Sequence, residues 1–71
     1  MLDFTCIFIS ADSYRFEAIL ARDLTSGLDW LLSADLKPGE QPFGIWHANQ
    51  IYELFGDQLH PTGNEIARMV A

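Results

Sequence analysis

The N-terminal segment Leu2–Ile9 is apolar on both sides of an extended chain, and this feature constrains the possible folds most. One side of such a strand carries Leu2, Phe4, Cys6 and Phe8. The other side becomes apolar at Ile7 and Ile9. An edge strand with one face in water would leave this second pair exposed. We therefore expect the strand to lie in the centre of a sheet or to be covered by a helix.

The segment Tyr14–Ala34 has the apolar spacing of an amphipathic helix. Residues that recur at helical intervals are Phe16, Ile19, Leu20, Leu24, Leu28 and Leu31. Asp12 or Ser13 could cap the start of this helix. Because the apolar stripe continues through the whole segment, we predict one long helix.

Two other interpretations of this segment stay open. Gly27 is unfavourable inside a helix, and Ser26 with Asp29 resembles a capping box that would divide the segment into two helices. Alternatively, Tyr14–Ala21 is the second strand of a hairpin, because apolar residues also alternate along it. These residues are Tyr14, Phe16, Ala18 and Leu20.

The remaining sequence predicts a hairpin followed by a short helix. The expected parts are a loop at Lys37–Pro42, strands at Phe43–His47 and Gln50–Phe55 around an Ala48-Asn49 turn, a stop at Gly56, a link at Asp57–His60, and a helix from Pro61 through Ile66, Met69 and Val70. Prolines and glycine favour the loop, Asn tolerates positive φ in the turn, and Pro suits the first turn of a helix.

These elements predict a single domain, residues 1–71, of the α+β class. The expected architecture is β-α-β-β, in which one amphipathic helix packs on a small, mostly antiparallel sheet, with a short C-terminal helix. Cys6 is the only cysteine, so no disulfide can form within the chain. The hydrophobic fraction of 49% argues for an apolar core, and dimerisation or a partner would supply the rest of the stability if that core is insufficient.

The charge balance bears on the class of partner. The chain has ten acidic and four basic residues, which gives a formal net charge of −6. Direct binding to nucleic acid or to an anionic membrane requires a basic face and is disfavoured, whereas a partner with a basic surface is favoured. The first apolar run is too short to span a membrane, and a lone cysteine fits a reducing compartment. We expect a cytoplasmic location.

Candidate catalytic and metal-binding groups are few. The run Asp57-Gln58-Leu59-His60 is similar to the Asp-x-x-His block of SGNH-type esterases, in which the histidine is the general base. Those enzymes also need a Gly-Asp-Ser nucleophile motif and a large parallel sheet, and this chain has neither the motif nor the length. His47 and His60 match no common zinc spacing, and Cys6 is typical of a small buried hydrophobe. We predict no enzyme activity, no cofactor and no metal.

We instead predict that the protein binds another macromolecule. Asp23 interrupts the apolar stripe between Leu20 and Leu24, so it should pair with an arginine or lie at a contact surface. Tryptophan is frequent at binding hot spots, which makes both tryptophans candidate anchors. The candidate partner-binding residues are Asp23, Asp29, Trp30, Asp35, Trp46, Glu53 and Asp57.

The region from Phe4 to Tyr52 resembles small bacteriophage and prophage accessory proteins. The matching residues are Asp12 with Phe16 at a helix entry, Leu20-Ala21-Arg22 with Leu24, Leu28 and Leu31, and Trp46-His47-Ala48-Asn49 at the hairpin. Gln50 stands where that pattern usually has glycine. The resemblance implies an inhibitor of a host protein or nucleoprotein complex, such as an anti-CRISPR protein, in the cytoplasm of a bacterial host.

A homo-oligomeric structural protein is the alternative prediction. In that case the helix stripe or the edge of the Leu2–Ile9 strand would complete the core in a homodimer. A small hydrolase that uses His60 and Asp57 is a third possibility, which requires ester turnover that His60→Ala abolishes.

Overall fold

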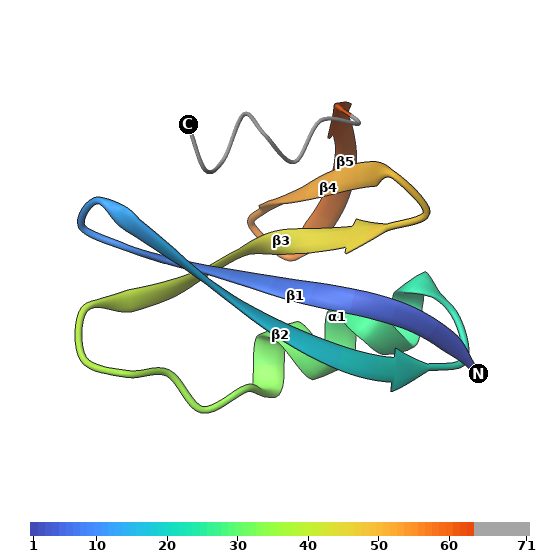
Figure 1. Cartoon of the computed structure of the whole chain (residues 1–71), viewed down its shortest axis with the longest axis horizontal. Coiled ribbons are helices and arrows are strands. Elements are labelled where there is room, and N and C mark those ends of the chain that lie inside the picture. The colour runs from blue at the N-terminus through green and yellow to red at the C-terminus, as the bar shows by residue number, and fades with distance from the viewer. Residues whose placement is uncertain (64–71) are drawn as a thin grey trace.

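The computed structural model describes residues 1–63, in which five antiparallel strands form one sheet and a single helix lies against it (Figure 1). The elements are β1 (Leu2–Ser10), β2 (Ser13–Ala21), α1 (Leu24–Ser33), β3 (Glu40–His47), β4 (Gln50–Phe55) and β5 (Gln58–Gly63). The strand order across the sheet is β2-β1-β3-β4-β5. β2 and β5 are therefore the two edges of the sheet.

The central position predicted for the N-terminal strand is confirmed, because β1 pairs with β2 on one side and with β3 on the other. Its first apolar side forms the main core beneath α1. The buried members of this core are Phe4, Cys6, Phe8, Ile19, Ala21, Leu31 and Ile45.

A second, smaller apolar cluster lies on the opposite face of the sheet. Ile7 and Ile51 are its buried centre, and Tyr14, Phe43 and Trp46 pack around them. The Tyr14 and Phe43 rings meet edge to face, with centroids 5.5 Å apart. Both sides of β1 are thus buried, as its two-sided apolar pattern requires.

Two residues determine where α1 starts and how closely it approaches the sheet. Asp23 is the N-cap, and its Oδ1 accepts a hydrogen bond of 2.9 Å from the Ser26 N–H. Gly27 lies against the sheet, where an added Cβ would be 3.3 Å from Ile45 Cδ1. Gly27 therefore permits close packing of helix on sheet and does not divide the helix.

The long helix predicted for Tyr14–Ala34 is wrong, and the hairpin alternative for Tyr14–Ala21 is correct. Ile19 faces the α1 core, whereas Phe16 and Leu20 are exposed on the other side of β2. The apparent helical stripe combined residues from opposite faces of one strand. Pairing along the whole of β1 outweighs the weak helical signal of this segment.

The Asp57–His60 link and the helix start at Pro61 are also wrong, because these residues form the β4–β5 turn and β5. Proline is tolerated in β5 because it is an edge strand. Thr62 and Gly63 also belong to β5, whereas Ile66, Met69 and Val70 of the predicted helix lie outside the described part of the chain. The fold is therefore a mostly β protein with the order β-β-α-β-β-β, and the α+β prediction is contradicted.

The predicted hairpin is confirmed in β3 and β4. Ala48 and Asn49 have positive φ angles of 49° and 67° and form the turn between them. Gly56, with φ 67°, follows the end of β4. β3 starts earlier than predicted, at Glu40, within the expected loop.

Candidate functional site

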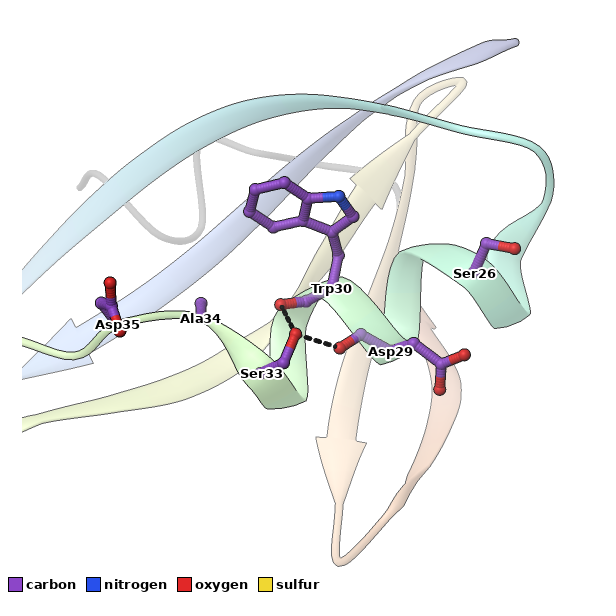
Figure 2. A pocket seen from close by; sticks show the side chains of 6 residues that line it. All are labelled: Ser26, Asp29, Trp30, Ser33, Ala34 and Asp35. Atoms are coloured by element: carbon purple, nitrogen blue, oxygen red, sulfur yellow. Dashed lines mark hydrogen bonds between the residues drawn. The ribbon is translucent and has the colours of Figure 1, made fainter.

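Two exposed residues of α1, Asp29 and Trp30, and the exposed Asp35 just after the helix form a group that we call the α1 patch. They line an open hollow of about 450 Å³ together with Ser26, Ser33 and Ala34. Figure 2 shows that Trp30 and Asp29 extend in different directions from the helix, while Asp35 lies just beyond its end. An aromatic surface and two carboxylates are thus exposed along α1 and just beyond its end.

The exposure of Trp30 follows from the orientation of α1. Gly27 and Leu31 occupy the buried side of the helix, and Leu31 is only 1% exposed. Trp30 precedes Leu31 and is rotated away from the core by about 100°, the angle between successive helical residues. It is 47% exposed.

The α1 patch has two acidic side chains and no basic one. The C-terminal end of a helix carries a partial negative charge, and α1 has no basic residue in its last turn. Ser33 Oγ donates to the carbonyl oxygens of Asp29 and Trp30, at 2.8 and 3.3 Å. Within residues 1–63 neither Asp29 nor Asp35 has an ion-pair partner. A cation from another molecule would relieve this accumulation of charge.

Arg15 is already engaged in ion pairs. Its guanidinium donates two hydrogen bonds of 2.8 Å to Glu40 and one of 3.0 Å to Glu17, and it lies 4.3 Å from the centroid of the Phe8 ring. The hydrogen bonds from Arg15 and from the Lys37 N–H lower the pKa of Glu40 to about 2, and the charge of Lys37 adds to the effect. This network ties β2 to β3 across β1, and sequence reasoning missed it.

Asp23 has a structural role that was not predicted. It is exposed, not buried in an apolar stripe, and no arginine among residues 1–63 bonds to it. The hydrogen bond from the Ser26 N–H is the main cause that lowers the pKa of Asp23. Asp23 is therefore a cap of α1 that lies at the opposite end of the helix from Asp35.

Trp46 and Glu53 lie on or beside the second sheet face, away from α1. Trp46 packs in the Ile7–Ile51 cluster, and its buried Nε1 has no hydrogen-bond partner among residues 1–63. Glu53, on β4, is half-buried and pairs with Gly44 and His60 in the strand registers. Trp46 is consequently a partly buried packing residue of this cluster.

Asp57 is exposed in the β4–β5 turn, beside the other flank of α1. It lines a hollow of about 320 Å³ with Leu24, Thr25, Leu28 and two residues of β5. The seven predicted binding residues therefore do not form one site. The structure brings Asp29, Trp30 and Asp35 together and places Asp23, Asp57 and the Trp46–Glu53 pair elsewhere.

The groups considered for catalysis or metal binding are separated. Cys6 is buried, and burial raises the pKa of its thiol to about 11. His47 Nδ1 lies 2.6 Å from the Asp3 carbonyl oxygen, whereas His60 meets the Phe55 ring edge to face. In the described part of the chain, no three His, Cys, Asp or Glu side chains form a group that could hold a metal ion.

Two exposed leucines near the α1 patch were also missed. Leu32 is 48% and Leu36 47% exposed. The predicted long helix placed Leu31 on one apolar stripe with Phe16 and Leu20, so the prediction did not separate the buried side of a short helix from its exposed side. A helix that starts after Asp23 would have placed Leu32 away from Gly27 and Leu31.

Among residues 1–63, no helix has the length and apolar character needed to cross a membrane. Comparisons of the chain with protein-family models, with curated proteins and with solved structures found no match.

Proposed function

We propose that this protein is a non-enzymatic binding protein that uses the α1 patch to hold a basic segment of another macromolecule. The observation that supports this most is a half-exposed Trp30 beside two carboxylates, Asp29 and Asp35, that lack a cation within residues 1–63. Separate basic residues of the partner segment would stack on the indole and pair with the carboxylates, which extend in different directions from α1 (Figure 2).

The resemblance to phage accessory proteins suggests the class of partner. We propose that it is a bacterial protein or nucleoprotein complex whose basic groove the acidic chain occupies, as an inhibitor of host defence would. The net charge of −6 would accelerate association with such a groove through electrostatic steering.

A tagged pull-down from bacterial lysate, eluted along a salt gradient, tests the proposal. The wild-type chain should retain one stoichiometric partner that leaves at moderate salt, because salt screens the attraction between exposed charges. The double variant Asp29→Lys/Asp35→Lys should lose it. The matched control Asp12→Lys/Asp57→Lys has the same net charge but leaves the α1 patch intact.

Retention by the control and loss by the patch variant would support the proposed site. Equal loss in both variants would show that only the overall charge matters. Recovery of the bait alone from the wild-type pull-down would contradict the proposed function.

A further inference from the structure

We infer that β2 is a self-association edge, through which two copies of the chain pair antiparallel about a twofold axis at Phe16. The two edges of the sheet differ in their suitability for pairing. β5 has six residues and contains Pro61, which cannot donate to a ladder. β2 has nine residues without proline or glycine, and within residues 1–63 no strand pairs with its outer side. A long edge of this kind is a template for another strand.

The hairpin register identifies the backbone groups that β2 presents outward. Ser10 and Ser13 pair across the two-residue turn, so they form the hydrogen-bonded pair that closes it. Hydrogen-bonded and non-hydrogen-bonded pairs then alternate along the ladder. The outward N–H and C=O groups of β2 consequently belong to Tyr14, Phe16, Ala18 and Leu20.

Self-pairing about a twofold axis normal to the sheet places one residue of β2 opposite its own copy, either one of these four or a residue between them. An axis at Arg15 or at Glu17 would set two like charges opposite each other, and an axis at Ile19 would set Glu17 opposite Ala21. An axis at Phe16 sets Arg15 opposite Glu17 of the partner copy, and Glu17 opposite the partner copy's Arg15. An axis at Ala18 sets Glu17 opposite Ile19 and Arg15 opposite Ala21, which leaves both charges against apolar residues. Opposite charges across a strand pair are favourable, so the charge pattern selects the Phe16 axis.

The exposed apolar side chains of β2 also support this register. Phe16 is 41% exposed, and its ring lies 6.5 Å from that of Tyr14 in a stacked arrangement. Pairing at Phe16 would bring two such rings together on the second sheet face and remove both from water. Aromatic cross-strand pairs stabilise a ladder beyond the area that they bury.

The dimer has a consequence for the proposed function, although it is inferred independently of it. A twofold axis normal to the sheet keeps both α1 helices on the same side of a ten-stranded sheet, a number obtained by doubling the five strands of one chain. Two α1 patches would then face one partner and raise the effective affinity without a new contact.

Sedimentation velocity of the full chain over a range of concentrations tests the inference. Wild type should have twice the mass of one chain at high concentration and dissociate on dilution. Phe16→Lys places two like charges at the axis and should yield a monomer. Leu20→Lys is the matched control, because Leu20 is on the same side of β2 and is 59% exposed but lies far from the axis. It should remain a dimer.

Other outcomes would overturn the inference. A wild-type monomer at all concentrations would exclude the dimer, and dimers in both variants would place the interface elsewhere. Loss of the dimer in both variants would contradict the Phe16 axis, since Leu20 faces Phe16 when the axis is at Ala18.

If Phe16→Lys does not fold, Phe16→Cys provides a second test. Under mild oxidation it should form a covalent dimer more rapidly than Ala18→Cys, and an equal or reversed order would refute the register. Asp29→Lys/Asp35→Lys should leave the dimer intact, which separates this inference from the proposed function.

Discussion

The two sides of α1 differ in what they contribute to the protein. The inner side consists of Gly27 and Leu31, which lie against the sheet and are buried. On the outer side, Trp30 and Leu32 are about half exposed, and Asp29 is also exposed. Large apolar side chains on the outer side add little to the core, although burying them would be favourable.

This difference separates stability from binding within one short helix. Single exposed apolar residues are common on protein surfaces, but a tryptophan beside two carboxylates without a described ion-pair partner is a less ordinary combination. Substitutions on the inner side of α1 should therefore destabilise the fold, whereas substitutions on its outer side should weaken partner binding. The following experiments test that separation.

The largest effect is expected from Leu31→Ala. Leu31 is 1% exposed and packs in the core with residues of β1 and β3, so its truncation should lower the free energy of unfolding by about 2–5 kcal/mol. Leu32→Ala is the matched control from the outer side, with an expected change within about 0.5 kcal/mol. Urea denaturation of both variants measures the difference. Similar losses in the two would contradict the assignment of the sides.

A smaller effect, which depends on pH, is expected from Glu40→Gln. The pKa of Glu40 is lowered from 4.5 to about 2, so its ionised form stabilises the fold above pH 4.5 and this contribution is lost as the pH falls towards 2. The variant should be less stable than wild type at pH 7, and the two should converge at low pH. Asp29→Asn is the matched control, because it also removes one negative charge, but from the outer side of α1. Thermal unfolding at several pH values should show almost no change for this control, and a parallel loss in both variants would refute the distinction between the two carboxylates.

Part of the fold was predictable because the residue pattern of some segments fits only one kind of secondary structure. The two-sided apolar pattern of Leu2–Ile9 correctly predicted a strand that is central in the sheet or covered by a helix. The Ala48-Asn49 turn marked the β3–β4 hairpin, because local turn chemistry was sufficient there. These features depend on neighbouring residues in the sequence.

The incorrect predictions arose where long-range pairing decides the outcome. Residues of β2 satisfy both a helical and an alternating period, and only pairing with β1 selects the strand. Pro61 favoured a helix start, yet it is tolerated at the sheet edge in β5. The α1 patch was predicted in part, since Asp29, Trp30 and Asp35 were named. Their separation from Trp46 could not be foreseen, because it depends on which face of the sheet each element covers.

The measurement that tests the central claim most directly is the affinity of the captured partner for Trp30→Ala, compared with Leu32→Ala, by isothermal titration calorimetry. Both residues lie on the exposed side of α1 and have nearly equal exposed fractions, 47% and 48%. The account predicts at least about a tenfold loss of affinity for Trp30→Ala, the size expected for a binding hot spot, in a variant that remains folded. Leu32→Ala should bind nearly as well as wild type. Unchanged affinity in Trp30→Ala would contradict the claim that the α1 patch is the binding site.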